Sequence, residues 1–329
     1  MEGFRVLIVG AGSIGERHAR CFLRAGAPSV SICEVRAERR AALRERYPLE
    51  AVYESFEQVP LEKFDAVIVC VPAHLHVEVS VRALDGGCHV LCEKPLALST
   101  DDADRLLQTV ARTDRVAAVA YVYRSIPAAA RLRELLQQGR IGVVRHVMAF
   151  VGQEFPRFRP DYREIYYSSH ATGGGAIHDA LSHIVNYVQW CIGLEQRVWC
   201  AADHFVLEGV GVEDTATITL YSPARFLASL NMNQFQKPNE VRLEFAGEKG
   251  SLALDMEGWR VGIFGNDSWQ WESYPIERDD AFVAQAKNFL AAIEGREPVR
   301  CTIQEGYETL RTIEAAHQSW RSGAEIHVR

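Results

Sequence analysis

Short apolar runs alternate with amphipathic segments over the first 120 residues of the chain. The apolar runs predict strands at residues 4–9, 30–33, 51–53, 66–71, 89–92 and 116–120. Apolar residues at helical spacing predict helices between them, at 14–25, 36–47, 77–84 and 101–112. Strands that are apolar throughout and separated by helices are typical of a parallel sheet covered on both faces. We therefore expect an α/β domain with a doubly wound parallel sheet over residues 1–123.

The pattern changes near residue 123. A helix is predicted at 128–138, and strands with alternating apolar and polar residues then dominate, reaching residue 206 and continuing at 216–220, 226–235 and 241–245. Two helices, 281–294 and 303–322, and a short strand at 325–328 close the chain. Alternation predicts a mostly antiparallel, open-faced sheet. With no low-complexity linker in the chain, we expect an α+β domain over 124–329 that packs firmly on the first.

Three glycines mark the turn between the first strand and the first helix. Gly10 permits a sharp turn, Gly12 lets the backbone approach a pyrophosphate, and Gly15 allows close packing of helix and strand. The N–H groups at the start of the helix, at Ser13 and Ile14, face the anion. The pattern predicts a dinucleotide-binding Rossmann turn. The alternative is an ordinary turn from strand to helix.

An acidic residue ends the second predicted strand. Glu34 follows Gly15 by 19 residues, where a carboxylate binds a ribose 2′-hydroxyl, and this favours NAD. Arg36, Arg39 and Arg40 follow closely enough for one of them to bind the extra phosphate of NADP. NAD is the expected cofactor, and NADP remains an alternative.

Polar residues also follow the fourth and fifth predicted strands. Ligands of doubly wound sheets bind beyond the carboxyl ends of the strands, which places residues 71–76 and 93–95 beside the cofactor. Lys94 precedes a proline and is held extended or in a turn, so that its amine can donate a hydrogen bond to a reacting oxygen. The alternative is a surface lysine that ends a strand.

A triple glycine precedes a predicted helix in the second half of the chain. Residues 173–175 allow another backbone to come close, and the helix that follows carries Asp179 and His183. Residues four apart share a helix face, and an acid beside an imidazole orients it and raises its basicity. The pair suits general acid and base chemistry. A structural pair of the same residues is the alternative.

The segment 153–170 is rich in arginine and aromatic residues. As a loop ahead of the helix with Asp179, it is a candidate to fold over a sugar, with rings stacked on the apolar face. The candidate substrate residues are Arg163, Tyr166 and Tyr167. The alternative is a surface excursion or a subunit contact.

Composition limits the partners. A net charge of −7 and an isoelectric point near 5.9 argue against nucleic acids and anionic membranes, and favour a small molecule. The opening residues lead straight into the first strand and no apolar run reaches membrane-spanning length, so we expect a cytoplasmic protein. Eight scattered cysteines predict reduced, buried thiols. Cys88 and Cys92 flank His89 but lack a second ligand pair, so no metal site is expected.

Together these motifs resemble the glucose-fructose oxidoreductase and inositol dehydrogenase family, written Gfo/Idh/MocA. The motifs that carry the resemblance are Gly10 to Gly15, Pro72 to His76, Glu93-Lys94-Pro95, Tyr123-Arg124 with Pro127, Gly173-Gly174 with Asp179 and His183, and Ala315-Ala316. The resemblance covers nearly the whole chain, and Glu-Lys-Pro joined to the later Asp-x-x-x-His is fairly specific for the family.

The resemblance implies a site between the two domains where a nicotinamide faces a substrate carbinol. His183 would exchange the hydroxyl proton, Lys94 would stabilise the developing oxyanion, and Asp179 would orient the pair. The expected cofactor residues beyond the glycine turn are Glu34, Val71, Pro72, His76, Glu93, Lys94 and Arg124. A cis bond before Pro95 and a homodimer or homotetramer are also implied.

The function that follows is NAD(P)-dependent interconversion of a secondary alcohol and a ketone on a sugar, inositol or sugar derivative. Two alternatives remain at this point. One is an NAD-dependent glycosidase of the same family, and the other is a non-catalytic NAD-binding regulatory protein.

Overall fold

The computed structural model describes residues 3–328 and divides into two compact units. Unit 1 comprises Met1–Ser125 and Glu277–Tyr307, and unit 2 comprises Ile126–Ile276 and Glu308–Arg329. These units differ from the two contiguous stretches expected, 1–123 and 124–329, because a late helix returns to unit 1.

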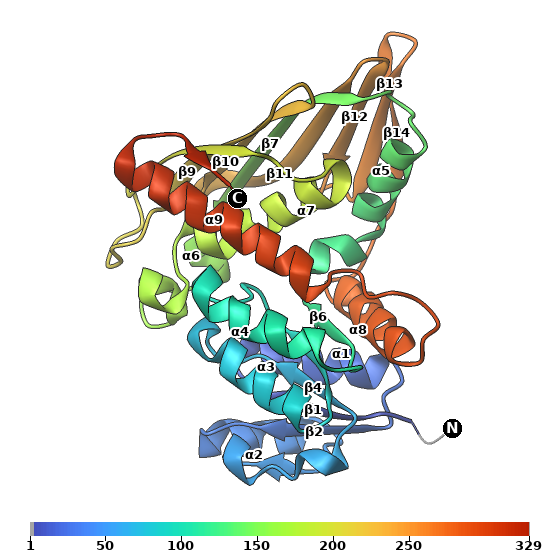
Figure 1. Ribbon diagram of the computed structural model, residues 1–329, viewed down its shortest axis with the longest axis vertical. Coiled ribbons are helices and arrows are strands. Elements are labelled where there is room, and N and C mark those ends of the chain that lie inside the picture. Colours follow the sequence, from blue (N-terminus) through green and yellow to red (C-terminus); the bar gives the residue numbers. More distant parts are fainter. Residues whose placement is uncertain (1–2, 329) are drawn as a thin grey trace. The chain divides into compact units, whose positions relative to one another are not determined.

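A six-stranded parallel sheet forms the centre of unit 1 (Figure 1). Its strands are β1 (Arg5–Val9), β2 (Ser29–Cys33), β3 (Val52–Tyr53), β4 (Ala66–Val69), β5 (His89–Cys92) and β6 (Ala117–Val119). They lie in the order β3-β2-β1-β4-β5-β6, and every pair is parallel. This is the strand order of a Rossmann fold. Every residue of β4 is buried, which accounts for the uninterrupted apolar run in the sequence.

Within the described residues, the α-helices that lie wholly in this unit are α1 (Ser13–Arg24), α2 (Ala37–Arg46), α3 (His76–Asp85), α4 (Thr100–Ala111) and α8 (Asp280–Ile293). Short 3-10 turns are η1 (Phe56–Gln58), η2 (Leu61–Lys63), η3 (Ala73–Leu75) and η4 (Val122–Ser125). Helix α4 begins after Ser99, whose hydroxyl accepts a hydrogen bond from the N–H of Asp102 at 3.2 Å and so satisfies a free donor of the first turn.

Helix α8 packs on α1, although more than 250 residues separate them in the chain. Phe289 shares a core cluster with Phe22, and their rings meet edge to face at 6.4 Å. Just before α8, Asp279 receives two hydrogen bonds from the Arg20 guanidinium, at 2.5 and 2.8 Å. Apolar packing and this bidentate pair together explain why α8 belongs to unit 1.

The ion pair between Arg20 and Asp279 contributes a stability to unit 1 that is lost at acid pH. The hydrogen bonds from Arg20 lower the pKa of Asp279 below its ordinary 3.8, despite the opposing effect of burial. A lowered folded-state pKa contributes stability above the unfolded pKa, and that stability is lost as the pH falls through the folded value. We expect Asp279→Asn to cost about 1–2 kcal/mol at pH 7. In urea unfolding, the difference in the free energy of unfolding between this variant and the unaltered protein should shrink below about pH 4. A difference that persists at pH 2 would contradict the role given to the Arg20–Asp279 pair.

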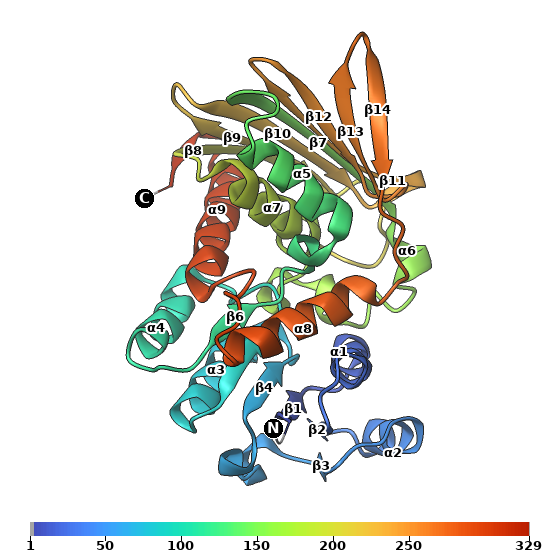
Figure 2. The same ribbon diagram turned by 90° about the vertical axis from the view of Figure 1, so that its right-hand side faces the viewer.

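A nine-stranded sheet forms unit 2 (Figure 2). Its strands are β7 (Val144–Glu154), β8 (Arg197–Asp203), β9 (Thr215–Ser222), β10 (Phe226–Asn233), β11 (Phe235–Gly247), β12 (Gly250–Asp255), β13 (Arg260–Gly265), β14 (Ser268–Ser273) and β15 (Ile326–His327). The order is β14-β13-β12-β11-β7-β10-β9-β8-β15, and all pairs are antiparallel except β7 with β10. The predicted mostly antiparallel sheet is confirmed. The alternation of apolar and polar residues did not predict strands β12 to β14.

Helices cover one face of this sheet. They include α5 (Pro127–Gln137), α7 (Ser182–Ile192) and the part of α9 (Ile303–Ser322) that falls in unit 2. A short helix α6 (Phe155–Phe158), 3-10 turns η5 (Tyr166–Ser168) and η6 (His170–Thr172), and a π-helical turn η7 (Ile177–Leu181) lie between β7 and α7. Figure 2 shows no described helix on the opposite face of the sheet, where Met148, Phe150, Trp199 and Leu227 are exposed.

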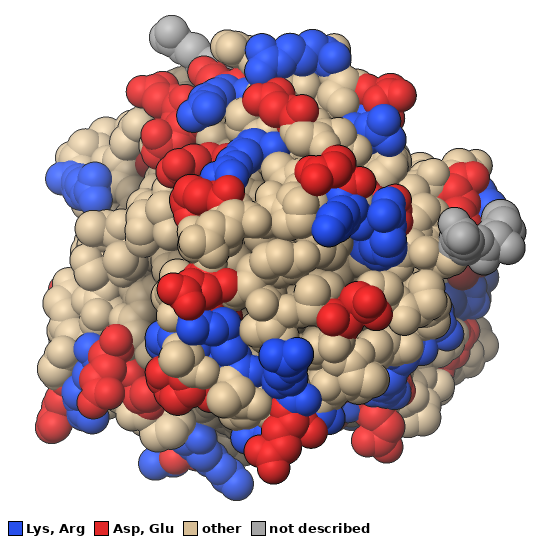
Figure 3. All heavy atoms as spheres, turned by 90° about the horizontal axis from the view of Figure 1, so that it is seen from below, with Lys and Arg blue, Asp and Glu red and all other residues tan. Residues whose placement is uncertain are grey.

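Charge is mixed on the surface. On the face drawn in Figure 3, acidic and basic side chains of the described residues alternate, without a continuous basic band. Within residues 3–328, no helix combines the length and apolarity that a membrane crossing requires.

Candidate functional site

The glycine turn of unit 1 has the geometry of a dinucleotide cradle. Gly10 has φ +86°, and a Cβ there would lie 2.7 Å from the carbonyl oxygen of Cys70. A Cβ on Gly15 would lie 1.9 Å from the carbonyl oxygen of Gly10, so helix and strand approach as closely as predicted. Above Gly12 the nearest atom to an added Cβ is 3.8 Å away, which leaves the backbone open to a ligand. The residues present therefore fit a pyrophosphate at the start of α1, where Ser13 and Ile14 begin the helix.

Glu34 lies beside this turn, directly after β2. Its carboxylate accepts hydrogen bonds from the N–H of Ala11 at 2.9 Å and from Nε of Arg36 at 2.9 Å. Burial raises the pKa of Glu34, but the hydrogen bonds from Arg36 and Ala11 outweigh it and the pKa is lowered. The carboxylate is therefore ionised at neutral pH, as an acceptor for ribose hydroxyls must be.

We expect Glu34→Ala to lower the preference for NAD over NADP by about tenfold or more, because a hydrogen bond to a charged group contributes about 1.5–3 kcal/mol. The variant also releases the half-exposed Arg36, which then becomes available for a 2′-phosphate. The dissociation constants of NADH and NADPH, measured by fluorescence, test this. Glu38→Ala, an exposed acid on α2, is the matched control. An unaltered ratio would show that Glu34 does not contact the ribose.

The loops after β4 and β5 are joined by His76, the first residue of α3. The ring nitrogens lie 2.7 Å from the carbonyl oxygen of Pro95 and 2.9 Å from that of Val71. Burial lowers the pKa of His76, although the two carbonyl oxygens favour the protonated ring. The neutral ring donates to one of the two carbonyl oxygens. His76 thus fixes the shape of both loops, Val71-Pro72 and Lys94-Pro95. The Lys94–Pro95 peptide bond is cis, which confirms the expectation from the resemblance.

Two further predicted residues of unit 1 are buried. Glu93 is 6% exposed and pairs with His18 of α1, at 2.6 Å between Oε1 and Nε2. Arg124 is 2% exposed, and its guanidinium donates to the carbonyl oxygen of Arg300 at 2.7 Å and to Glu305 at 2.6 Å. Arg124 therefore holds the returning C-terminal segment of unit 1, and its role toward a cofactor stays a prediction.

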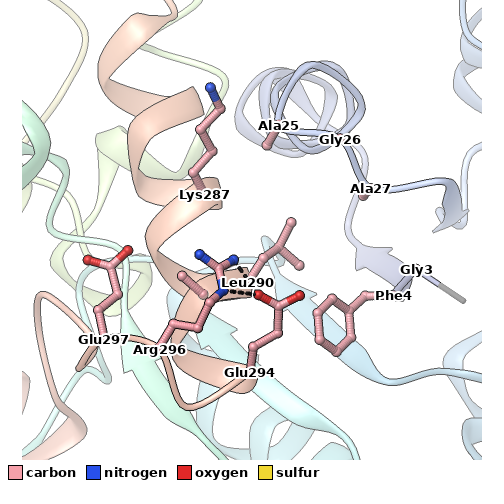
Figure 4. A pocket seen from close by; sticks show the side chains of 11 residues that line it. Gly3, Phe4, Ala25, Gly26, Ala27, Lys287, Leu290, Glu294, Arg296 and Glu297 are labelled. Atoms are coloured by element: carbon pink, nitrogen blue, oxygen red, sulfur yellow. Dashed lines mark hydrogen bonds and ion pairs between the residues drawn. The ribbon is translucent and has the colours of Figure 1, made fainter. Parts of the chain in front are cut away.

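A hollow of about 370 Å³ opens at the other end of this sheet (Figure 4). Phe4 precedes β1 and Ala27 precedes β2, so the hollow lies at the amino ends of these strands. Its Arg296 forms an ion pair with Glu294. Ligands of doubly wound sheets bind at the carboxyl ends, so this hollow is not the predicted cofactor site.

In unit 2, the triple glycine brings two segments together as predicted. A Cβ on Gly174 would lie 2.0 Å from the carbonyl oxygen of Tyr167, and one on Gly175 would lie 2.5 Å from the Glu213 carboxylate. Glu213 also accepts a hydrogen bond from the N–H of Ile177 at 2.9 Å. These contacts fix the start of the turn that carries Asp179.

Asp179 lies on a π-helical turn, whereas His183 lies in the first turn of α7. The expected helix is present, but its first turn is wider than an α-helical turn. Asp179 is 9% exposed, and its carboxylate accepts a hydrogen bond from the Tyr166 hydroxyl at 3.0 Å. The structure thus brings one substrate candidate, Tyr166, against one catalytic candidate. π-Helical turns within helices are frequent at functional sites.

The other two substrate candidates lie elsewhere. Tyr167 is fully buried in a core cluster with Phe155 and Tyr162, and its hydroxyl donates to the Gln234 side chain. This corrects its expected role, because a ring without exposed surface offers nothing to a ligand. The exposed Arg163 donates to the carbonyl oxygen of Glu208 at 2.8 Å and lies over the Tyr162 ring.

The eight cysteines are free, and seven of them are buried, as the sequence predicts. Cys88 lies with its Sγ 3.4 Å from the carbonyl oxygens of Leu61 and Phe64. Burial raises the pKa of the Cys88 thiol to about 11, so it remains protonated at neutral pH.

Two family models match the chain. The model described as "Oxidoreductase family, NAD-binding Rossmann fold" matches residues 4–121, and the GFO/IDH/MocA C-terminal domain matches residues 129–253. The chain belongs to the GFO/IDH/MocA oxidoreductase family. The predicted enzyme class and NAD as the cofactor are confirmed at this level.

Several relatives of this chain are named dehydrogenases. The chain is 23% identical to the D-glucoside 3-dehydrogenase of Escherichia coli (strain K12), with 98% of this chain and 97% of the relative covered. It is 24% identical to the myo-inositol 2-dehydrogenase of Thermotoga maritima, with 96% of each covered. A solved oxidoreductase domain protein from Kribbella flavida shares the fold, with a TM-score of 0.90, 23% identity and 100% of both chains covered.

Sequence reasoning missed two residues in this GFO/IDH/MocA chain, His18 and Glu213. His18 follows Gly15 on the buried face of α1, and a histidine on an otherwise apolar helix face was the available signal. Glu213 follows a glycine-rich stretch and is buried before β9. Neither sequence pattern indicates which distant residue the side chain contacts, Glu93 for His18 and Ile177 for Glu213.

Proposed function

We propose that this oxidoreductase oxidises one secondary hydroxyl of a sugar, inositol or sugar derivative to a ketone, with NAD as acceptor. The observation that carries the proposal is the Glu93-Lys94-Pro95 loop in the same unit as a glycine turn whose geometry fits a dinucleotide. The same chain also has the Asp-x-x-x-His helix. The named relatives support the substrate class, because glucosides and myo-inositol are both rings with adjacent secondary hydroxyls.

Three side chains have separate roles in the proposal. The Lys94 ammonium donates a hydrogen bond to the substrate oxygen and stabilises the negative charge that develops on it. The His183 imidazole takes the hydroxyl proton in the oxidation and returns it in the reduction. Asp179 orients these groups, and the hydrogen bond from Tyr166 fixes its carboxylate. When bound, NAD supplies the two-electron acceptor for the carbinol carbon.

A substrate panel tests the proposal. The purified protein is incubated with NAD or NADP and with glucosides, inositols, levoglucosan, aldoses and uronates, and absorbance at 340 nm is recorded. We expect reduced cofactor with at least one cyclic polyol, and a ketone of unchanged carbon skeleton by mass spectrometry. Release of an aglycone without net NADH would instead identify a glycosidase. NADH binding without turnover on the whole panel would favour a regulatory protein.

We further propose that the open face of the nine-stranded sheet joins copies of this chain. Met148 is 48% exposed and Trp199 is 42% exposed, and the strand register places both in one row across the sheet. Exposed apolar side chains on a broad sheet face mark an interaction surface.

We expect a dimer or tetramer in light scattering after gel filtration, and a smaller species for Met148→Glu, because burial of a carboxylate opposes association. Leu194→Glu, at an exposed leucine just after α7, is the matched control and should leave the mass unchanged. A monomeric unaltered protein would contradict the proposal.

A further inference from the structure

His18 is a buried histidine on the helix that follows the glycine turn. Its side chain is 1% exposed, and it lies three residues after Gly15 on the face of α1 that points into unit 1. Nε2 lies 2.6 Å from Oε1 of Glu93. Because an ionised carboxylate only accepts, the imidazole donates through Nε2.

The same carboxylate holds the backbone of Lys94. Oε2 of Glu93 accepts the N–H of Lys94 at 3.0 Å. Burial raises the pKa of Glu93, but the hydrogen bond from His18 and the charges of His18 and Lys94 outweigh burial and lower it. One ionised carboxylate therefore connects α1 to the backbone of the proposed catalytic lysine.

The imidazole ring has little freedom to turn. It meets the Phe282 ring edge to face at 5.7 Å between centroids and the Phe22 ring at 6.3 Å. Nδ1 has no hydrogen-bond partner among the described residues, so the bond to Glu93 is the one hydrogen bond that the structure gives this ring. The unpartnered Nδ1 of the buried His18 destabilises the fold, because a buried polar atom without a hydrogen bond has lost its contact with water.

We infer that His18 is a positioning residue that acts through Glu93 to fix the backbone from which the Lys94 side chain extends. The inference rests on the proposed catalytic role of Lys94 and adds a residue to it. His18 also links the glycine turn to the backbone of Lys94. Helix α1 begins at the turn that fits the pyrophosphate, and His18 lies within two helical turns of that start. A small displacement of a catalytic group costs up to about a hundredfold in rate, which sets the size of effect to expect.

Two substitutions separate the hydrogen bond from the packing. His18→Phe keeps an aromatic ring between Phe22 and Phe282 but removes the donor, whereas His18→Gln keeps an N–H donor near the place of Nε2. We expect His18→Phe to lower kcat by about tenfold to a hundredfold with KM for the polyol within about threefold. His18→Gln should restore kcat to within about fivefold of the unaltered enzyme. Equal losses in the two variants would overturn the inference, since packing alone would then explain them.

A measurement without cofactor keeps the inference testable if a variant fails to fold. In the NAD-free protein, imidazole 15N spectra should show His18 with the proton on Nε2, and that signal should shift in Glu93→Gln. A neutral ring with its single proton on Nδ1 would overturn the inference, because Nε2 could not then donate to Glu93. The dissociation constant of NADH should change by less than about threefold in His18→Gln.

A matched control uses the histidine at the opposite end of β5. His89 accepts the N–H of Val116 at 2.8 Å through Nδ1, and His89→Phe removes that bond without touching Glu93. Its kcat should stay unchanged. If Lys94→Ala keeps full turnover, the proposed function fails; if Lys94→Ala is inactive and His18→Phe is fully active, the present inference fails and the proposed function stands.

Discussion

Lys94→Ala is expected to lower kcat on the order of a thousandfold, because removal of one donor to a developing oxyanion typically costs two to three orders of magnitude. Cofactor binding should be nearly unaffected, since the backbone of Lys94 and the Glu93 carboxylate that holds it remain. Steady-state rates at 340 nm, with the best substrate of the panel, and fluorescence titration with NADH measure the two effects separately.

Lys63→Ala is the matched control for this experiment. Lys63 is an exposed lysine of the same unit, at the end of a 3-10 turn, and its removal should leave kcat and NADH binding unchanged. Full turnover in Lys94→Ala would refute the role proposed for Lys94. A parallel loss of NADH binding would instead make it a cofactor ligand.

The glycine turn and the strands of unit 1 could be predicted because their causes are local. A strand buried on both faces must be apolar at every position, and a turn in which an added Cβ would meet a backbone atom requires glycine. The hairpins from β12 to β14 were missed for the opposite reason. Gly262 and the alternating tryptophans of β14 carry a weak local pattern, and cross-strand pairing stabilises these strands.

The place of α8 could not be read from the chain either. The apolar residues of α8 predict a helix with one buried face. The surface that this face covers is α1, through Arg20 and Phe22, which lie far away in the sequence. Helical periodicity identifies a buried face and says nothing of what covers it. The chain therefore returns to unit 1 at Glu277–Tyr307, although the sequence pattern placed these residues in the second domain.

The candidate site shows the same limit at the level of single side chains. Tyr166 and Tyr167 are adjacent and chemically identical, yet one hydroxyl contacts Asp179 and the other contacts Gln234 in a core. Successive residues of a 3-10 turn point about 120° apart, so one of two neighbours is buried when the turn packs. Composition identified the segment as a candidate, and only packing separates the two rings.

His183→Gln is expected to lower kcat by about a hundredfold to ten-thousandfold, the usual contribution of a positioned acid or base. The more informative variant is Lys94→Ala combined with His183→Gln. Residues that act as one unit are strongly non-additive, so the double variant should be about as slow as the slower single variant. The exposed His327→Gln, on β15, is the control and should leave kcat unchanged. If the two losses instead multiply, Lys94 and His183 contribute independently, and the proposal that both act on one carbinol fails even though each residue matters.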